Sequence, residues 1–387
     1  MLRVLTLSTL FPDETRPNFG VFVERQTCGL ASRPDTQVTV VAPVGLPPAL
    51  LRAARHRALA GLPHGETWHG LDVHRPRFLA LPATGGRWHA ALLARAVRPL
   101  LDRLAGSFDV IDASFFFPDG PAAVALGRRY GVPVSIKARG ADVHHWGRVR
   151  RRQVRAAGFA ADGLLAVSRS LKADMVALGL PAERIRLHRT GIDHARFHAR
   201  DRAAARAKLG ITGPVVLSLG ALIERKGHAI VTDAIARVPD ATLLIAGDGP
   251  DRAALTAQAT RLGVAGRVRL LGSVPHGDLP SLLRAVDVMA LASASEGLAN
   301  AWVEALACGT PIVVTDAGGA GEVVTTPAAG RIVARDAAAF ADAIAALLAN
   351  PPAPTETTRA ADPFSWDRNA RELRDHLAGL VAARATS

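Results

Sequence analysis

The chain has few cysteines and no long uninterrupted apolar segment. Its 387 residues include only Cys28 and Cys308, which lie far apart and lack the spacing of metal ligands. We therefore interpret them as small buried side chains in a reducing compartment. No apolar run reaches the roughly 18 residues that a membrane-spanning helix needs. The first residues are followed too soon by Asp13 and Glu14 to form a signal peptide, so we expect a cytoplasmic protein that does not span a membrane.

The chain also has no glycine-rich turn of the kind that binds a dinucleotide. The first expected strand is followed by Ser8-Thr-Leu-Phe-Pro12, and the first strand of the second half by Gly220-Ala-Leu-Ile-Glu-Arg-Lys-Gly227. Neither segment contains Gly-x-Gly-x-x-Gly, in which glycines let the backbone approach the pyrophosphate. An NAD-dependent dehydrogenase is therefore disfavoured.

Negative charge is scarce in the first half of the chain. Residues 1–199 contain 28 Lys and Arg against 15 Asp and Glu, whereas residues 200–387 contain 19 of each kind. The whole formal net charge of +13 thus belongs to the first half. This asymmetry predicts that the first half meets an anionic partner: a phosphate-bearing acceptor, a membrane surface or nucleic acid.

Strand-like apolar runs alternate with helical patterns along both halves, which predicts an α/β fold with two doubly wound parallel sheets. The expected strands are 4–10, 38–42, 110–113, 132–136 and 163–167 in the first half, and 215–219, 241–246, 268–271, 286–291 and 311–315 in the second. We place the domain junction near residue 197. Such sheets bind ligands at the carboxyl ends of their strands, so two sheets that face each other would enclose a ligand between them.

Two glutamates flank the start of one expected helix in the second half. The loop Ser293-Ala-Ser-Glu-Gly297 precedes a helix from about residue 298 to 307, which places Glu296 just before the helix and Glu304 inside it. Free N–H groups at a helix start bind anions, and eight helical residues rise by about 12 Å. The two carboxylates are therefore spaced to bind hydroxyl groups on either side of a diphosphate, as in a nucleotide sugar. The alternative is an acid that stabilises the helix dipole and a solvated glutamate.

The segment around these glutamates resembles the donor-binding signature of retaining glycosyltransferase family 4. From Glu296 and Glu304 it continues through Ala305-Leu-Ala-Cys-Gly-Thr-Pro-Ile-Val-Val-Thr-Asp-Ala-Gly-Gly319 to Gly321-Glu-Val-Val324. Other similar segments are distributed over almost the whole chain: Phe11-Pro12, Pro17-Asn-Phe-Gly-Val-Phe-Val23, Gly163-Leu-Leu-Ala-Val-Ser168, Arg189-Thr-Gly-Ile-Asp193, Leu244-Ile-Ala-Gly-Asp-Gly-Pro250, Val268-Arg-Leu-Leu-Gly-Ser-Val274 and Phe364-Ser-Trp366.

The resemblance implies the GT-B fold, in which two Rossmann-like, doubly wound domains face each other across a cleft. Residues 1–197 would form the acceptor-side domain, residues 198–363 the donor-binding domain, and residues 364–387 a C-terminal helix that crosses back to the first domain. The family transfers a sugar from a nucleotide-sugar donor with retention of the anomeric configuration. Its members generally need no metal and no cofactor.

The resemblance also implies roles for individual residues. Glu304 would hold the ribose hydroxyls, and Glu296 would contact sugar hydroxyls near the reacting carbon. Lys226 matches the lysine that neutralises the leaving diphosphate, because fixed cations must stabilise that anion where no metal does so. Backbone N–H groups of three residues, and the close approach of one glycine, would complete the donor site: Gly297, Leu298, Ala299 and Gly20.

The sequence departs from the family pattern at two positions. Ala221 stands where many members have an arginine, and Arg225 is our candidate for the missing cation. Arg139 stands where many members have a histidine that assists at the sugar, so we count it among the catalytic candidates and assign it to phosphate or acceptor charge. His144 or His145 is a second candidate for the histidine role, and an exposed structural histidine is the alternative.

Residues 144–155 form a strongly basic segment that contains no acidic residue. We predict that Trp146, Arg150, Arg151 and Arg152 contact an anionic membrane or a lipid-diphosphate acceptor. The alternative is a solvated basic helix face. Nucleic acid is not an expected partner, because no ladder of stacking aromatic residues accompanies the charge.

We therefore interpret the chain as a metal-independent retaining glycosyltransferase. It would act in the cytoplasm, at the inner face of the cell membrane, on a saccharide or lipid-linked acceptor of bacterial surface polysaccharide or glycoconjugate synthesis. Two alternatives share parts of this pattern. A GT-B sugar-nucleotide epimerase would convert the donor without an acceptor, and a noncatalytic module would bind a nucleotide sugar without turnover.

Overall fold

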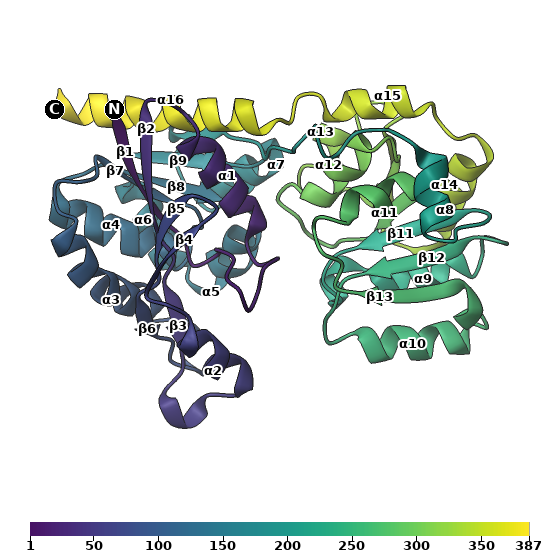
Figure 1. Cartoon of the computed structure of the whole chain (residues 1–387), viewed down its shortest axis with the longest axis horizontal. Coiled ribbons are helices and arrows are strands. Elements are labelled where there is room, and N and C mark those ends of the chain that lie inside the picture. Colours follow the sequence, from purple (N-terminus) through teal and green to yellow (C-terminus); the bar gives the residue numbers. More distant parts are fainter. Residues whose placement is uncertain (387) are drawn as a thin grey trace. The chain divides into compact units, whose positions relative to one another are not determined.

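The computed structural model describes residues 1–386, which divide into two compact units. Unit 1 contains Met1–Gly191 together with the segment from Trp366 onward, and unit 2 contains Ile192–Ser365. The junctions expected from the sequence, after residues 197 and 363, lie within a few residues of these borders. Each unit is built on a mainly parallel sheet with helices around it, which confirms the predicted α/β fold class (Figure 1).

The main sheet of unit 1 has eight strands in the order β10-β9-β8-β7-β1-β2-β5-β4. Its neighbouring strands are parallel except β4 and β5, which form an antiparallel pair at one edge. A separate parallel pair joins β3 to β6. The strands are β1 (Leu2–Leu7), β2 (Thr36–Val41), β3 (Val44–Leu46), β4 (Gly65–Trp68), β5 (Leu71–His74), β6 (Arg77–Leu79), β7 (Val110–Ala113), β8 (Val134–Ala138), β9 (Gly163–Ala166) and β10 (Ile185–Leu187).

Helices cover both faces of the main sheet of unit 1. The helices are α1 (Val21–Ala31), α2 (Ala54–Gly61), α3 (His89–Arg103), α4 (Asp119–Tyr130), α5 (Gly147–Val149), α6 (Arg151–Ala160), α7 (Arg169–Ala177) and α16 (Trp366–Ala385). On one face α16 packs on α1, and its Leu373 and Leu377 join Leu2 and Val4 of β1 in one buried cluster. On the other face α4 packs on β7 and β8, with α3 and α6 against it.

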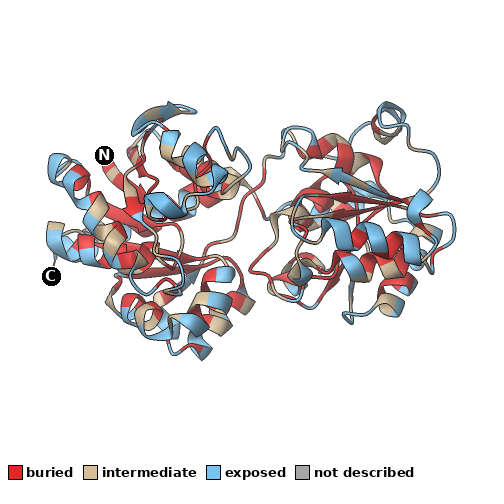
Figure 2. Cartoon of the chain, turned by 90° about the horizontal axis from the view of Figure 1, so that it is seen from below, coloured by how far each residue is buried: buried red, intermediate tan, exposed pale blue. Residues whose placement is uncertain are grey.

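Unit 2 is built on a six-stranded parallel sheet in the order β13-β12-β11-β14-β15-β16. The four inner strands are almost wholly buried, whereas the edge strands β13 and β16 are partly exposed (Figure 2). The strands are β11 (Val215–Leu219), β12 (Thr242–Ala246), β13 (Val268–Gly272), β14 (Val288–Leu291), β15 (Ile312–Thr315) and β16 (Gly330–Val333). The helices are α8 (Arg202–Lys208), α9 (His228–Ile235), α10 (Arg252–Arg261), α11 (Leu279–Ala285), α12 (Asn300–Ala307), α13 (Ala320–Val323), α14 (Ala337–Ala349) and α15 (Pro354–Thr358). The helices α9 and α14 pack together on the sheet, where Phe340 and Ile344 join the buried cluster of its strands.

The ten predicted strands are all present, with bounds that differ by a few residues. The largest difference is in β1, which ends at Leu7 because Ser8 begins a turn in which its hydroxyl bonds Leu10. The strands β3, β4, β5, β6, β10 and β16 were not predicted. Each has only three or four residues and is only partly buried, so it lacks the continuous apolar run that marks the four-residue strands β7, β9, β14 and β15. No helix in residues 1–386 has the length and apolar character needed to cross a membrane.

Candidate functional site

Three loops of unit 2 meet at the carboxyl ends of β11, β14 and β15, which are neighbours in the sheet. Two backbone hydrogen bonds join these loops: Ala294 N donates to Arg225 O at 2.8 Å, and Gly319 N donates to Gly297 O at 2.7 Å. The carboxyl edge is where doubly wound sheets bind ligands. The loops therefore form the candidate site of this unit.

Close packing of the β15 loop fixes the position of the β14 loop. Gly318 has a φ of 56°, and a Cβ at this position would clash with the backbone oxygens of Glu296 and Gly297. Thr315 Oγ1 also donates a hydrogen bond to Ser293 O at 2.5 Å. Only glycine fits the left-handed conformation at Gly318 without strain. The sequence Asp-Ala-Gly-Gly after β15 thus holds the Glu296 loop in place.

Glu296 is held by basic and hydroxyl groups from two of these loops. Its Oε1 accepts hydrogen bonds from Lys226 Nζ at 2.6 Å and from Ser293 Oγ at 2.7 Å. Arg225 Nη1 lies 3.8 Å from Glu296 Oε2 and donates to Ser295 O at 2.5 Å. The structure thus brings together three of the four predicted catalytic residues, Glu296, Lys226 and Arg225, whereas Arg139 belongs to unit 1. Two cations beside one carboxylate leave an excess of positive charge, which favours an anionic ligand.

Glu304 lies in the second turn of α12 and contacts a histidine that was not among the predicted site residues. His276 Nε2 is 3.0 Å from Glu304 Oε1, and the His276 ring packs on Phe197 with 5.4 Å between ring centroids. An ionised carboxylate only accepts hydrogen bonds, so Nε2 is the donor in this pair. His276 Nδ1 is buried and has no partner among residues 1–386.

The start of α12 leaves backbone donors unused. The helix begins at Asn300, two residues later than predicted, and Ala299 before it provides no side-chain cap. Among the described residues, no acceptor is bonded to the N–H groups of Gly297, Leu298 and Ala299. Free N–H groups beside a helix start form an anion site. Their contact with a diphosphate remains a prediction.

Gly20 of unit 1 has a structural reason to be glycine. It precedes α1 with a φ of 72°, and a Cβ there would lie 2.5 Å from Leu10 O. The loop after β1 therefore packs against the start of α1 at a distance that any side chain would prevent. The approach of Gly20 to a donor diphosphate remains a prediction.

Arg139 follows β8 and is bonded within unit 1. Its Nε donates to Ser114 O at 2.7 Å, its Nη2 donates to Gln26 Oε1 at 3.2 Å, and its guanidinium lies 4.8 Å from the centroid of the Phe22 ring. Burial lowers the pKa of Arg139 to about 10, so the side chain stays charged at neutral pH. The predicted contact with phosphate or acceptor charge would use its remaining donors.

A buried polar network beside Arg139 was not predicted. Lys137 Nζ donates to Gln26 Oε1 at 2.7 Å and to His188 Nδ1 at 2.8 Å, and His188 Nε2 donates to Asn369 O of α16 at 2.9 Å. Burial lowers the pKa of both Lys137 and His188 well below their ordinary values. A neutral His188 that accepts at Nδ1 and donates at Nε2 satisfies every bond in this chain. The network ties α16 to the end of β8.

The two predicted substitutes for the family histidine have different surroundings. His144 Nε2 lies 2.9 Å from Asp174 Oδ2 of α7. His145 is exposed, and the edge of its ring contacts Trp146. His144 is thus bonded to a neighbouring helix, whereas His145 is accessible to solvent.

The predicted membrane residues divide into bound and exposed side chains. Trp146 packs on Phe117, with ring centroids 4.8 Å apart. Arg150 donates to Thr84 O at 2.6 Å and to Gly85 O at 2.8 Å. Trp146 and Arg150 therefore contribute to packing within unit 1. The predicted residues that lie exposed at the start of α6 are Arg151 and Arg152.

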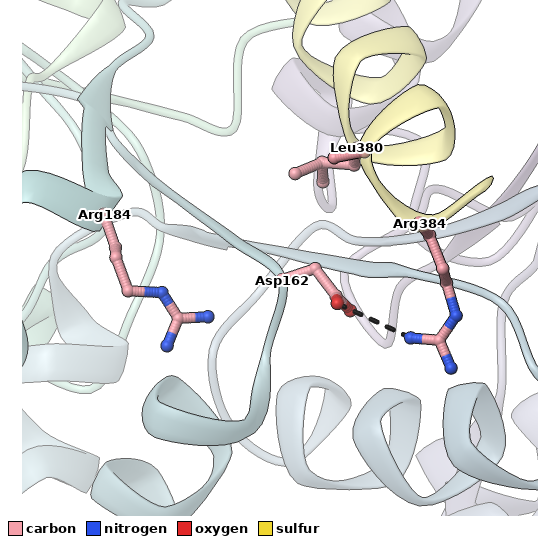
Figure 3. A pocket seen from close by; sticks show the side chains of 5 residues that line it. Asp162, Arg184, Leu380 and Arg384 are labelled. Carbon is pink, nitrogen blue, oxygen red and sulfur yellow. Dashed lines mark ion pairs between the residues drawn. The ribbon is translucent and has the colours of Figure 1, made fainter. Parts of the chain in front are cut away.

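Unit 1 has a pocket of about 450 Å³ at the end of its main sheet opposite to the carboxyl ends of the strands (Figure 3). Asp162 and Arg184, which line it, stand before β9 and β10, at the amino ends of these strands. Arg384 of α16 faces Asp162, with 3.6 Å between Nη1 and Oδ1, and Arg184 Nη1 donates to Phe159 O at 3.0 Å. The pair of Asp162 and Arg384 thus helps to attach α16, whereas Arg184 bonds the segment before β9. Nowhere in residues 1–386 do three or more His, Cys, Asp or Glu side chains group as metal ligands.

Family models match both units of the chain. Residues 20–196 match the model of Glycosyltransferase Family 4, and residues 201–363 match that of Glycosyl transferases group 1. The GDP-mannose-dependent alpha-(1-6)-phosphatidylinositol monomannoside mannosyltransferase of Mycolicibacterium smegmatis is 31% identical over 309 residues, which cover 73% of this chain and 80% of that protein. A Bacillus subtilis protein assigned as a teichuronic acid biosynthesis glycosyltransferase is 27% identical over 332 residues, which cover 82% of each chain.

Solved structures of glycosyltransferases have the same fold. Sucrose-phosphate synthase from Thermosynechococcus elongatus has a TM-score of 0.84 at 20% identity, over 99% of this chain and 100% of that one. HepE of Anabaena, in complex with UDP-glucose, has a TM-score of 0.73 at 21% identity, over 98% and 100% of the two chains. The predicted GT-B fold and the predicted family are confirmed. The chain belongs to glycosyltransferase family 4, the group 1 glycosyltransferases, and is a glycosyltransferase.

Proposed function

We propose that the protein transfers a sugar from a nucleotide-sugar donor, with retention of the anomeric configuration, to a saccharide or lipid-linked acceptor. The reaction belongs to bacterial surface polysaccharide or glycoconjugate synthesis, in the cytoplasm at the inner face of an anionic membrane. The observation that carries the proposal is the cluster of Lys226, Arg225 and Glu296 beside the unused N–H groups before α12. HepE, which shares the fold, was solved with UDP-glucose, and the mycobacterial relative uses GDP-mannose.

In this proposal the donor diphosphate accepts hydrogen bonds from the N–H groups of Gly297, Leu298 and Ala299. Glu304 binds the ribose hydroxyls at the nucleoside end, and Glu296 binds hydroxyls of the sugar at the other end. Ligand hydroxyls donate to carboxylates, and phosphate oxygens accept from N–H groups, so each ligand group meets a complementary partner.

The chemical step breaks the bond between the anomeric carbon and the diphosphate oxygen, whose electron pair stays on the diphosphate. An acceptor hydroxyl oxygen forms the new bond to the anomeric carbon, and its proton passes to the departing diphosphate. Lys226 and Arg225 stabilise this growing negative charge, so the reaction needs no metal ion and no cofactor. Lys226 Nζ is already fixed by Glu296 at 2.6 Å. A cation that is held in place before the reaction stabilises charge without further reorganisation.

Calorimetric titration with UDP and GDP tests the donor site, and NMR of the transferred sugar tests retention. A nucleotide at about 100 times its dissociation constant should raise the free energy of unfolding by about 2.7 kcal/mol. Inverted configuration in the product would contradict the retaining mechanism. Binding without transfer to any acceptor would favour the noncatalytic module, and isomerised donor in the absence of acceptor would favour the epimerase.

A further inference from the structure

Between β3 and β4 the chain leaves the main body of unit 1. We call this segment, residues 47–62, the basic excursion. It contains the one-turn helix Ala49–Leu51 and the helix α2, and neither helix has a buried residue. Figure 1 shows α2 beyond β3 and β6, away from the main sheet. Leu59 and Ala60 pack partly against a small buried cluster at its base. The excursion is thus anchored at its base and open to solvent at its tip.

The basic excursion presents two adjacent exposed leucines before α2. Leu50 is 100% exposed and Leu51 is 59% exposed. A single exposed apolar side chain is common on a soluble surface and needs no explanation. Two neighbouring exposed leucines form a small apolar patch, whose contact with water is unfavourable. Insertion into a lipid surface would remove this patch from water.

The charge around these leucines is of one sign. Arg52, Arg55 and Arg57 follow them directly, and residues 36–65 contain no Asp or Glu. In residues 1–386 these three arginines have no carboxylate partner: Arg52 and Arg57 donate to backbone oxygens, and Arg55 Nε lies 3.4 Å from a nitrogen of His56. Such unpaired cations keep their full attraction for an external anion.

Two other arginines of unit 1 show a contrast, because each is paired with a carboxylate, whereas Arg151 and Arg152 are exposed, as are two of the three in the excursion. Arg75, which lies in the linker after β5, binds Glu66, and Arg3 binds Asp109. Paired arginines such as Arg75 and Arg3 support the fold, whereas unpaired arginines leave positive charge at the surface. The basic excursion belongs to the second kind.

We propose that the basic excursion docks unit 1 on an anionic lipid bilayer. Leu50 and Leu51 enter the boundary between headgroups and acyl chains, and the arginines bind lipid phosphates. An apolar patch with a basic flank has the chemistry of an interfacial membrane anchor. The inference rests on the proposed function, because a lipid-linked acceptor requires the enzyme at a membrane. It assigns the contact to a segment far in sequence from Trp146 and Arg150.

Co-sedimentation of the full chain with lipid vesicles tests the proposal. The wild type should bind vesicles of phosphatidylglycerol and phosphatidylethanolamine but not phosphatidylcholine alone, and added salt should weaken the binding. A basic side chain near such a surface contributes about fivefold in affinity. Arg55→Ser with Arg57→Ser should therefore weaken binding roughly thirtyfold by the same per-residue factor. Leu50→Ser with Leu51→Ser should weaken it by at least about tenfold.

Matched substitutions elsewhere provide the controls. Val176 and Leu209 are each 40% exposed, so Val176→Ser with Leu209→Ser removes exposed apolar groups outside the excursion. Arg261→Ser with Arg269→Ser removes the same charge from exposed positions of unit 2. Both control pairs should bind vesicles as the wild type does.

Three results would overturn the proposal: a wild type that ignores anionic vesicles at low salt, excursion variants that bind like the wild type, or binding lost only with Arg151→Ser and Arg152→Ser on α6. Titrations of the same variants with UDP and GDP distinguish failure of the membrane-docking proposal from failure of the proposed function. Unchanged nucleotide binding with lost vesicle binding supports the excursion. A wild type that binds vesicles but neither nucleotide would overturn the proposed function and leave the docking surface standing.

Discussion

The two units have the same kind of sheet but use the polar side chains at their strand ends differently. In unit 2, Glu296 and Lys226 are bonded to each other, and the neighbouring backbone N–H groups have no partner among the described residues. In unit 1, Lys137, His188 and Asp119 are fully buried and bonded to unit 1 itself. Unit 2 thus keeps donors available for a ligand, whereas unit 1 uses its polar groups to fix its own loops. Substitution of Lys226 or Glu296 should therefore change chemistry, and substitution of Asp119 should change stability.

Lys226→Ala should give the largest change in catalysis, and Arg225→Ala a change of the same kind. Both cations are placed to stabilise charge that grows as the diphosphate leaves, so turnover should fall more than nucleotide binding. A lost charge-assisted contact of about 1.5–3 kcal/mol corresponds to roughly ten- to a hundredfold in rate. Lys226 Nζ lies 2.6 Å from Glu296 Oε1, whereas Arg225 Nη1 lies 3.8 Å from Glu296 Oε2. Lys226→Ala should therefore reduce turnover more than Arg225→Ala does.

Steady-state kinetics and thermal unfolding of both variants make this test. Unfolding should be nearly unchanged if the cations serve catalysis. A kinetically silent Arg225→Ala beside an impaired Lys226→Ala would contradict our assignment of Arg225 as the replacement for the cation absent at Ala221.

Glu304→Ala and Glu296→Ala should separate nucleotide binding from sugar transfer. Glu304→Ala removes the acceptor for ribose hydroxyls, and a lost hydrogen bond to a charged group should weaken nucleoside diphosphate binding about tenfold or more. Glu296→Ala should leave that binding nearly unchanged and impair transfer. Calorimetry with UDP and GDP measures the difference, and equal losses of affinity in both variants would contradict the assignment.

Asp119→Asn should change the pH dependence of stability in unit 1. Asp119 Oδ2 accepts from Thr9 N at 2.9 Å, Oδ1 has no partner in residues 1–386, and burial raises the pKa from 3.8 to about 7. Between these values the folded state holds a proton that the unfolded state has released. Raising the pH through this window therefore lowers the free energy of unfolding, by at most about 1.4 kcal/mol per pH unit.

Urea unfolding of the wild type and Asp119→Asn near pH 5 and near pH 7 measures this slope. The variant should lose most of it, although burial also raises the pKa of Asp112 to about 6 and leaves a smaller slope of the same sign. Identical slopes in the two proteins would mean that Asp119 does not titrate in this range.

His276→Phe should give the smallest effect. Phenylalanine keeps the ring contact with Phe197 but removes the nitrogen that donates to Glu304. A less firmly oriented Glu304 should weaken UDP or GDP binding about fivefold, the equivalent of one neutral hydrogen bond, with kcat little changed. His276→Gln restores a donor and should recover part of the affinity. No difference between the two variants in calorimetry would contradict the positioning role.

The parts of the fold that the sequence predicts are those with a long, periodic or contiguous signal. The strand β11 has the bounds expected from its apolar pattern. The pair β3–β6 lacks this signal, because each strand has only three residues and its partner is distant in the chain. The antiparallel β4 lacks it because none of its four residues is buried. Tertiary pairing, rather than local propensity, decides such segments.

The site shows the same division between local and distant information. Glu296, Glu304 and Gly297 lie in one contiguous motif and were predicted together. Lys137 and His188 are 51 residues apart, and the contact between them exists only after folding. Arg150 was predicted from its charge to face a partner, but it reaches the carbonyl of Thr84, 66 residues away. A basic residue in a sequence predicts a positive charge, but the sequence does not show which group binds or neutralises that charge.

The attachment of α16 gives unit 1 an unusual order of assembly on the ribosome. Leu373 and Leu377 complete the cluster that contains Leu2 and Val4, and Asn369 O accepts the hydrogen bond from His188. All of unit 2 is translated between these two parts of one core. The face of the unit 1 sheet that α16 covers therefore stays exposed while unit 2 is translated. The unit that is translated first is the one that is finished last.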